Sequence, residues 1–290
     1  MDELPFRAGY VAIIGRPNAG KSTLLNQLLG RRLAIVTSRP QTTRYRILGI
    51  LNGPNYQALF FDTPGLLDAK YPLHKFMEKE IHQALDDSDL LLLLIDATHP
   101  EFTDLKLLAG RQSLVAINKI DAVAKQSLLP IAAECDRADI KNIFMISALT
   151  GNGVADLQQK IIEFLPVGAP FYPQDLLSER PERFFVAELI REVVFKYYGA
   201  EIPYATAVVV DEFRERPNRK DYICAIIYVE KESQKGIIIG EKGRALKKVG
   251  EVARDSIEQF LGRPVYLELW VKVARGWRQN TNFIRQQLYS

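Results

Sequence analysis

The sequence contains very little cysteine, histidine or tryptophan, with two, three and two residues among 290. The two cysteines, Cys135 and Cys224, lie far apart and no C-x-x-C pair occurs, which argues against a disulfide framework or a zinc site. We expect both to be free structural thiols. The three histidines, His74, His82 and His99, have no partner at a spacing typical of a catalytic triad or a metal site.

Long apolar runs are also absent. The longest, around Leu90 to Ile95, is far shorter than the roughly 18 residues of a membrane-spanning helix. The amino-terminal residues lack the apolar core of a signal peptide, so we expect a cytosolic protein. Neither charge sign dominates, because the net charge is only +3, but residues 179–290 hold 20 Lys and Arg against 16 Asp and Glu. This mild basic excess is compatible with a polyanionic partner without demonstrating one.

Four short motifs occur in order along the first half of the chain. They are Gly15–Ser22 (GRPNAGKS), Asp62–Gly65 (DTPG), Asn118–Asp121 (NKID) and Ser147–Leu149 (SAL). The first is a phosphate-binding loop, which alone does not separate ATP from GTP. An amide and a carboxylate complement the O6 acceptor and the N1–H and N2–H₂ donors of guanine, so the third motif predicts a guanine-nucleotide site.

Each motif has an expected role. The helix that follows the loop directs its positive end at the phosphates, Lys21 bridges the terminal phosphates, and a backbone N–H of Ser147–Ala148 meets guanine O6. We predict nucleotide contacts from Gly15, Arg16, Pro17, Asn18, Ala19, Gly20, Lys21, Ser22, Thr23, Asp62, Thr63, Pro64, Gly65, Asn118, Lys119, Asp121, Ser147, Ala148 and Leu149.

Magnesium binding and catalysis draw on the same residues. Ser22 and Asp62 are predicted magnesium ligands, and one hydroxyl of the Pro40–Arg44 segment closes over the ion in the triphosphate state. We expect Thr43 to supply it, with Thr42 as the alternative. The backbone N–H of Gly65 senses the γ-phosphate. The predicted catalytic residues are therefore Lys21, Thr43 and Gly65, and the predicted metal ligands are Ser22, Thr43 and Asp62.

One expected catalytic residue is missing. Ras-like GTPases place a glutamine that orients the attacking water directly after the Asp-x-x-Gly glycine, whereas this sequence has Leu66. We therefore expect slow intrinsic hydrolysis that depends on a partner, a second ion or another residue. Related GTPases that have a hydrophobic residue at the position of Leu66 and an asparagine in the phosphate loop use potassium there. Asn18 is therefore the candidate ligand for potassium.

The order of short apolar runs predicts two domains. Residues 1–165 alternate β-rich runs with amphipathic stretches, which is typical of a doubly wound α/β domain with a mainly parallel sheet. Residues 166–178 are punctuated by proline and glycine and are predicted to be a linker. Residues 179–290 are predicted to form an α+β domain with a C-terminal helix, in which the strands begin near Tyr204, Tyr222 and Val265.

The second domain contains a G-x-x-G turn between a short apolar helix and a basic helix. KH domains clamp about four nucleotides of single-stranded RNA with such a loop, and the order of elements matches a type II KH fold. We predict RNA contacts from Lys235, Gly236, Ile239, Gly240, Glu241, Lys242, Gly243, Arg244 and Lys247, with Lys248 and Arg254 nearby. A surface turn without a ligand is the alternative.

Over its whole length the sequence resembles the bacterial Era family of GTPases. The resemblance rests on the four motifs, on Gln41–Arg44 (QTTR), and on Glu230–Gly236 (EKESQKG) leading into Ile239–Gly243 (IGEKG). It implies GTP or GDP with Mg²⁺ as cofactors, binding near the 3′ end of the small-subunit 16S ribosomal RNA, and a role in small-subunit assembly. It also implies peripheral association with the inner face of the membrane. We expect a monomer.

Two other functions fit part of the pattern. One is an RNA-binding assembly factor that keeps nucleotide only for structure, and the other is a GTPase acting in tRNA modification. Among the aromatic residues, Tyr197, Tyr198 and Trp270 are expected in the core rather than as base-stacking platforms. Trp277 lies beside Arg275 and Arg278 in the sequence and could lie near RNA.

Overall fold

The computed structural model describes residues 5–289, which divide into two compact units. The first unit comprises residues up to 68 together with 76–179, and the second comprises 69–75 together with the residues from 180 onward. The short segment 69–75 follows the DTPG motif, so the division does not follow chain order at that point.

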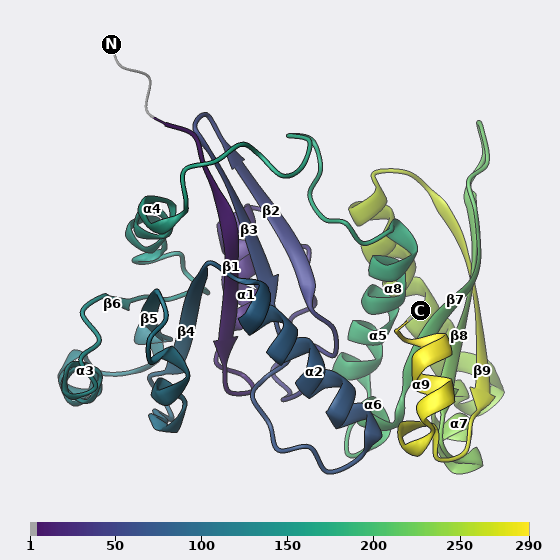
Figure 1. The fold of residues 1–290 in the computed structure, drawn as a ribbon. Helices are drawn as coiled ribbons and strands as arrows, with labels where there is room; N and C mark the ends of the chain where they lie inside the picture. Colours follow the sequence, from purple (N-terminus) through teal and green to yellow (C-terminus); the bar gives the residue numbers. More distant parts are fainter. Residues whose placement is uncertain (1–4, 290) are drawn as a thin grey trace. The chain divides into compact units, whose positions relative to one another are not determined.

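Six strands form a mixed sheet in the first unit (Figure 1). Their order is β2-β3-β1-β4-β5-β6, and all neighbours are parallel except β2 and β3. Only Pro54 and Asn55 join β2 to β3, which is too short for a parallel crossover. The mainly parallel sheet expected from the sequence is present. The strands are β1 Arg7–Gly15, β2 Ile47–Gly53, β3 Tyr56–Asp62, β4 Leu90–Asp96, β5 Ser113–Asn118 and β6 Ile143–Met145.

Helices cover both faces of this sheet. A side chain at Gly49 would meet Leu25 and Leu29, whereas its neighbours Leu48 and Ile50 belong to a core cluster that includes residues of α2 and α3. Since neighbouring strand residues point to opposite faces, α1 lies on one face and α2 with α3 on the other. The helices are α1 Lys21–Leu29, α2 Pro72–Asp87, α3 Leu128–Arg137 and α4 Val154–Phe164, with 3-10 turns at Thr103–Leu108, Ile120–Ala122 and Lys125–Ser127.

The segment predicted to be a linker, residues 166–178, is bound to the first unit. Gln57 is fully buried, and its Oε1 accepts hydrogen bonds from the backbone N–H groups of Phe171 at 2.7 Å and Tyr172 at 3.0 Å. Its Nε2 donates to the carbonyl of Tyr172 at 2.8 Å. Ser178 adds a hydrogen bond from its hydroxyl to the carbonyl of Leu48. This unit therefore extends past residue 165 to residue 179.

The second unit is a three-stranded sheet with helices packed against it. The strand order is β7-β8-β9, with β7 antiparallel and β9 parallel to β8. Residues of α5, α7 and α8 form one apolar cluster with alternate residues of the three strands. The elements are α5 Glu182–Tyr197, α6 Ile202–Ala205, β7 Ala207–Arg214, β8 Asp221–Val229, α7 Glu232–Ile239, α8 Arg244–Leu261, β9 Val265–Val273 and α9 Thr281–Gln287, with 3-10 turns at Glu241–Gly243 and Trp277–Gln279.

The observed order of elements agrees with the type II KH order predicted from the sequence. One helix, α6, was missed, because the pattern placed the start of a strand at Tyr204, whereas β7 begins at Ala207. Pro203 lies in the first turn of α6, where its fixed φ angle favours a helix start. Pro203 is therefore the sequence signal for α6, which the apolar pattern alone did not indicate.

Two expectations about aromatic residues are wrong. Trp270 is 55% exposed rather than buried, and Tyr197 is 49% exposed. Trp277, which was considered for RNA contact, is only 1% exposed, and its Nε1 donates to the carbonyl of Ala205 at 2.8 Å. Tyr198 is buried as predicted. Residues on both faces of a sheet recur with the same period of two. The pattern around Trp270 therefore does not show whether its face of the sheet is covered.

Within residues 5–289, Cys135 and Cys224 are buried free thiols, as expected. Across the same range, no helix is long and apolar enough to cross a membrane.

Gln57 provides a test of how firmly the segment 166–178 is held. Gln57→Leu removes the partners of the Phe171 and Tyr172 backbone groups, so we expect a loss of about 1–3 kcal/mol in the free energy of unfolding. Urea unfolding measures this loss, and limited proteolysis should show new cleavage within 166–178. Gln158→Leu, which removes only a 3.3 Å bond to the Tyr56 hydroxyl, is the matched control. Equal protease resistance in the two variants would contradict this account.

Candidate functional site

The phosphate-binding loop connects the end of β1 to the start of α1, at the edge of the sheet where the parallel strands end. Gly20 has a φ of +98°, and a Cβ atom there would lie 2.2 Å from Nδ2 of Asn118. Only glycine fits this close approach. The backbone N–H groups of the first turn of α1 have no side-chain cap, which leaves them available to an anion.

Lys21 is buried, with only 6% of its surface exposed. Its Nζ donates to the carbonyls of Gly15 at 2.9 Å and Arg16 at 3.0 Å, so the side chain folds back over the loop. Burial lowers the pKa of this ammonium to about 8, against the opposing effect of Asp62 and Asp104. The lysine therefore still carries its charge at neutral pH and can neutralise a phosphate.

Three oxygen-bearing side chains meet beside Lys21. The Ser22 hydroxyl donates to Oδ2 of Asp62 at 2.7 Å and lies 3.0 Å from the Thr43 hydroxyl. Oδ1 of Asp62 is buried and has no hydrogen-bond partner in the described part of the chain. Burial raises the pKa of Asp62 to about 6, although Ser22 and Lys21 oppose the rise, so the carboxylate is ionised at pH 7. This set of hard oxygen donors with one unused carboxylate oxygen fits Mg²⁺.

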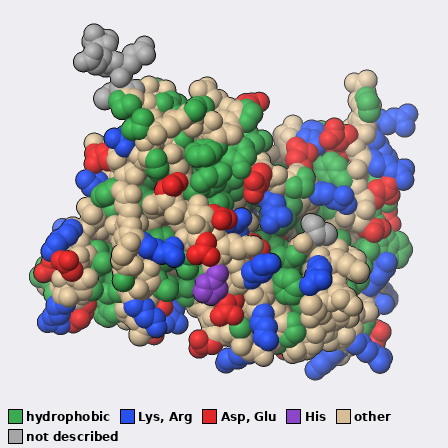
Figure 2. Space-filling model, in the orientation of Figure 1, with side chains coloured by type: hydrophobic (Ala, Val, Ile, Leu, Met, Phe, Trp, Pro, Cys, Tyr) green, Lys and Arg blue, Asp and Glu red, His purple; other side chains and the backbone are tan. Residues whose placement is uncertain are grey.

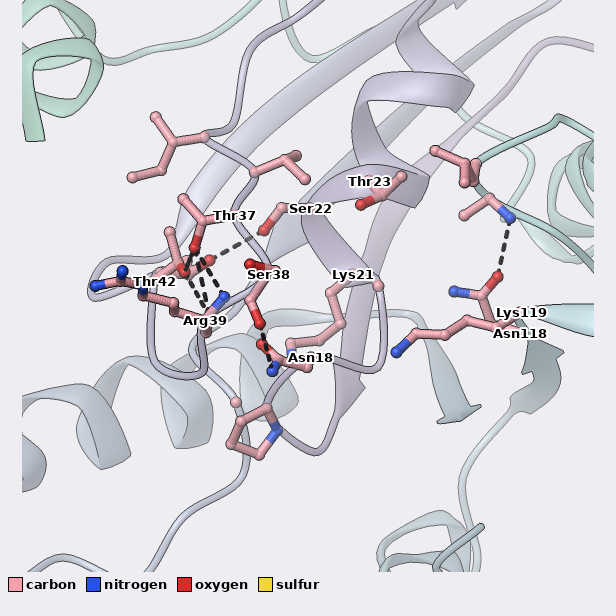
Figure 3. Close-up of a pocket in the computed structure, with 18 of the residues that line it drawn as sticks. Asn18, Lys21, Ser22, Thr23, Thr37, Ser38, Arg39, Thr42, Asn118 and Lys119 are labelled. Atoms are coloured by element: carbon pink, nitrogen blue, oxygen red, sulfur yellow. Dashed lines mark hydrogen bonds between the residues drawn. The ribbon is translucent and has the colours of Figure 1, made fainter. Parts of the chain in front are cut away.

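Thr43 and Thr42 make different contacts. Thr43 joins Ser22, whereas the hydroxyl of Thr42 donates to the carbonyl of Arg39 at 2.8 Å and lies 2.7 Å from the Thr37 hydroxyl. Thr42 therefore holds the loop together while Thr43 faces the predicted metal position. Figure 3 shows Thr37, Ser38, Arg39 and Thr42 on one side of the pocket, with Asn118 and Lys119 on the other.

Asn118 has a structural task besides the predicted reading of guanine. Its Nδ2 donates to the carbonyl of Ala19 at 2.8 Å, and its Oδ1 accepts from the Ala148 N–H at 2.9 Å. The side chain thus ties the phosphate loop to the SAL loop. The Ala148 N–H is a predicted donor to guanine O6, and in this structure it already donates to Oδ1 of Asn118. Asp121 is exposed and lines the pocket, so its carboxylate is free to meet the guanine donors.

Two acidic residues that support the site were missed in the sequence. Asp96 ends β4 and accepts a hydrogen bond from Nζ of Lys119 at 2.5 Å. Burial acts to raise the pKa of Asp96, but the hydrogen bonds from Lys119 and Thr98 lower it overall. Asp104 accepts from Nε of Arg16 at 2.7 Å, so that side chain points away from the pocket. The available signal for Asp96 was an acidic residue directly after an apolar strand, as at Asp62.

The cavity has a volume of about 460 Å³, which is sufficient for a nucleotide. The predicted residues that line it are Pro17, Asn18, Gly20, Lys21, Ser22, Thr23, Thr43, Gly65, Asn118, Lys119, Asp121, Ala148 and Leu149. The other predicted residues are not among those that line the cavity: Gly15, Arg16, Ala19, Asp62, Thr63, Pro64 and Ser147. The lining residues that were not predicted are Ile35, Val36, Thr37, Ser38, Arg39, Gln41 and Ala122, and Thr42, the predicted alternative to Thr43, also lines the cavity.

Leu66 and Asn18 occupy positions relevant to hydrolysis. Leu66 packs against the core cluster of the sheet, so its side chain does not replace the missing glutamine. Asn18 adopts a φ of +64°, and its Nδ2 donates to the carbonyl of Ser38 at 3.2 Å. The Asn18 amide therefore lies between the phosphate loop and the first switch segment, while its Oδ1 is available as a ligand.

The G-x-x-G loop of the second unit joins α7 to α8. Gly240 has a φ of +69°, and a Cβ atom there would lie 2.5 Å from Cβ of Ala245. Lys242 also adopts a left-handed conformation and is exposed, as is Glu241. Ile239, a predicted RNA contact, packs partly against the core, whereas Ile237 is 52% exposed. The start of α7 is fixed by Oε1 of Gln234, which accepts from two backbone N–H groups.

Basic side chains around the loop remain available to phosphates. Among residues 5–289, no ion pair involves Lys235, Lys242, Arg244 or Lys247. Lys248 lies 3.9 Å from Glu251, and Arg254 lies 3.6 Å from Asp255. The four unpaired cations are the first candidates for phosphate contact, since the other two are already compensated.

Two family models match the chain. Residues 10–123 match the 50S ribosome-binding GTPase model, and residues 201–278 match the KH domain model. Similarity to curated proteins extends over the full length. The chain is 46% identical to the GTPase Era of Geotalea uraniireducens, with 99% of each chain covered. It is 41% identical to the chloroplastic GTPase ERA1 of Zea mays, with 98% of this chain and 70% of that protein covered.

Two solved Era structures are similar over almost the whole chain. One is an Aquifex aeolicus Era variant bound to GDP and AlF₄⁻, with a TM-score of 0.94, 38% identity and 98% of this chain and 100% of that chain covered. The other is Era in complex with MgGDPNP and nucleotides 1506–1542 of 16S ribosomal RNA, with a TM-score of 0.94, 38% identity and coverage of 98% and 99%.

The contacts of Thr43 and Thr42 predict different responses to magnesium. Thr43→Ala should weaken binding of a non-hydrolysable GTP analogue about tenfold in Mg²⁺, equivalent to about 1.4 kcal/mol, and have little effect in EDTA. Thr42→Ala removes bonds within the switch loop, so its effect should be the same in both buffers. Isothermal titration in each buffer measures both variants. A magnesium-dependent loss in Thr42→Ala, with none in Thr43→Ala, would reverse the assignment.

Proposed function

The chain belongs to the Era family of GTPases, and we propose that its nucleotide state controls how its KH domain holds the 3′ end of small-subunit ribosomal RNA. The observation that carries the proposal is the end-to-end similarity to Era in complex with MgGDPNP and a 16S RNA fragment. The residues of this chain support it, because it has both a phosphate loop with a magnesium donor set and an exposed G-x-x-G loop.

The GTPase activity follows from charge neutralisation and positioning. Water attacks the γ-phosphate in line, and the developing charge falls on oxygens that Lys21 faces. Ser22, Thr43 and Asp62 would hold magnesium, which supplies further positive charge to the phosphate oxygens when bound. Burial keeps the charge of Lys21 effective, since a low local dielectric weakens its attraction less than water would.

The attacking water lacks an obvious side chain to orient it. Leu66 packs into the core, so we propose that a monovalent cation held by Asn18 contributes the missing positive charge. The Oδ1 of Asn18 and the nearby loop carbonyls are the oxygen donors that potassium prefers. Because the water-orienting glutamine is absent, we expect hydrolysis to be slow without such a cation or a partner.

The rival functions have less support. A factor that keeps nucleotide only for structure is disfavoured because the chain is a GTPase. The end-to-end Era relatives favour ribosomal RNA over a role in tRNA modification. The division into a GTPase domain at 1–165, a linker at 166–178 and a KH domain at 179–290 is proposed as the functional division. A role in small-subunit assembly, a cytosolic monomer and contact with the inner membrane face stay predictions.

Asn18 gives a direct test of the potassium proposal. GTP hydrolysis should be faster in potassium than in sodium buffer, because sodium is smaller and fits the same oxygens poorly. Asn18→Ala should remove this difference while GTP affinity changes little. Single-turnover hydrolysis in matched potassium and sodium buffers measures the effect. An Asn18→Ala rate that falls equally in both buffers would assign the residue to switch positioning instead, through its bond to Ser38.

The RNA-binding role predicts a specific loss at the G-x-x-G loop. The double variant Lys242→Gln, Arg244→Gln should bind RNA of nucleotides 1506–1542 more weakly. The slope of log affinity against log salt should fall by about 0.7 for each lost phosphate contact. Fluorescence anisotropy at several salt concentrations measures both quantities. Lys248→Gln is the control, since Lys248 is already close to Glu251 and its loss should leave the slope unchanged.

The same titration tests the nucleotide dependence. RNA affinity should differ between protein loaded with the GTP analogue and protein loaded with GDP. Equal affinities in the two states, measured for the wild-type chain and for the control, would contradict a switch and leave only constitutive RNA binding.

A further inference from the structure

The KH sheet has a second face, opposite the one that packs against α5 and α8. Its side chains form cross-strand rows, which are Arg214–Tyr222–Tyr266, Glu212–Cys224–Glu268, Val209–Ile226–Trp270 and Ala207–Tyr228–Lys272. At one end, α9 covers the face through the contact of Phe283 with Tyr228. Towards the other end two large rings are open, with Tyr266 56% exposed and Trp270 55% exposed.

These rings are held in place rather than loose. Glu268 lies between them and uses both carboxylate oxygens: Oε2 accepts from the Tyr222 hydroxyl and Oε1 from Nε1 of Trp270, each at 2.8 Å. Tyr222 and Tyr266 stack with ring centroids 6.0 Å apart and an interplanar angle of 15°. The hydrogen bond to Glu268 raises the pKa of Tyr222 to about 12, so its hydroxyl remains a donor. The platform is therefore preorganised.

Most acidic side chains near the platform lie close to a cation, but Glu268 keeps its negative charge. Glu212 forms an ion pair with Arg214, whereas both oxygens of Glu268 accept from neutral ring donors. Asp221 accepts from Nε of Arg263 at 2.6 Å, and Glu215 lies 3.8 Å from the same arginine. Asp211 is the remaining exposed carboxylate on β7.

Basic side chains at the platform are, by contrast, available. No ion pair in the described part of the chain involves Arg216, Arg219, Lys220 or Lys272. The guanidinium of Arg216 lies 5.0 Å from the centre of the Tyr222 ring. Three of these residues lie on the hairpin between β7 and β8, which projects at the upper right in Figure 1. Figure 2 shows Lys and Arg side chains gathered around that projection.

We propose that this open sheet face, with Tyr266 and Trp270 as stacking rings and the β7–β8 hairpin as its basic border, is a second binding surface for single-stranded RNA. Exposed rings stack on unpaired bases of any sequence, and unpaired cations beside them contact the backbone phosphates. The combination favours a nucleic acid over a protein partner, because an apolar protein surface would leave four cations without compensation. The choice of RNA as the ligand of this surface rests on the proposed RNA-binding function.

The chain allows a specific optical test, because it has only two tryptophans and Trp277 is buried. Base stacking on Trp270 should quench its fluorescence when RNA of nucleotides 1506–1542, extended by ten unpaired uridines at each end, is added. The quench should disappear in Trp270→Phe, which keeps a ring for stacking and therefore keeps the affinity. The double variant Tyr266→Ala, Trp270→Ala should lower the affinity about fivefold or more.

Tyr197→Ala is the matched control, since Tyr197 is a similarly exposed aromatic residue of the same unit outside this face. Its RNA affinity should equal that of the wild type. Lys242→Gln, Arg244→Gln reports independently on the G-x-x-G loop. If that variant is weakened while Tyr266→Ala, Trp270→Ala binds normally and RNA does not quench Trp270 in the wild type, the second surface is refuted and the proposed function stands.

Two further outcomes overturn the proposal in different ways. If loop and platform variants all bind RNA as the wild type does, the proposed RNA-binding function fails together with the second surface. If the platform variant binds RNA normally but loses affinity for purified small ribosomal subunits, the face contacts a protein instead.

Discussion

The nucleotide pocket depends on one buried side chain, Asn118. Its amide nitrogen binds the carbonyl of Ala19, and its amide oxygen binds the N–H of Ala148, so three loops from distant parts of the sequence are joined at a single point. The amide is 2% exposed, and leaving one of these buried groups without a partner costs about 1–3 kcal/mol. Gly20 is required by the same contact, because a side chain there would collide with the amide. The phosphate loop and the base-reading loop are thus positioned together.

How far the sequence predicts this structure depends on whether a feature is local. The phosphate loop and the G-x-x-G turn are short motifs whose backbone requirements depend on adjacent residues, and the structure shows the expected glycine conformations at each. Asp96 and Asp104 contact residues far away in the sequence, so their partners do not follow from spacing, although the position of Asp96 at the end of an apolar strand was an available signal. The segment 166–178 has the composition of a free linker, yet distant residues of the first unit, with the buried Gln57 foremost, hold it through hydrogen bonds. Trp277 is buried and Trp270 is exposed, contrary to expectation, because Phe283 of the short α9 packs against Trp277 and Tyr228, while the end of the same sheet face that carries Trp270 stays open.

The catalytic apparatus is incomplete in a way that suits a switch. Lys21, Ser22, Thr43 and Asp62 supply charge and ligands, but the position that orients water in Ras-like enzymes is a leucine packed into the core. Thr43 and Asn18 both connect the phosphate loop to the first switch segment. These contacts suit a switch, and under the proposed function they would respond to the bound nucleotide while hydrolysis requires an additional ion or partner.

The two units share one local feature that suits phosphate, but in different surroundings. Helices α1 and α8 each begin after a glycine in the left-handed conformation, without a side-chain cap, and each has a basic residue at its first position, Lys21 or Arg244. The free N–H groups and the helix dipole favour an anion at both ends. Lys21 is buried, so its charge acts in a low dielectric and selects one compact ligand. Arg244 is exposed and screened by salt, so the second site suits an extended RNA strand that must be released, and additional stacking surface would be needed to lengthen its residence.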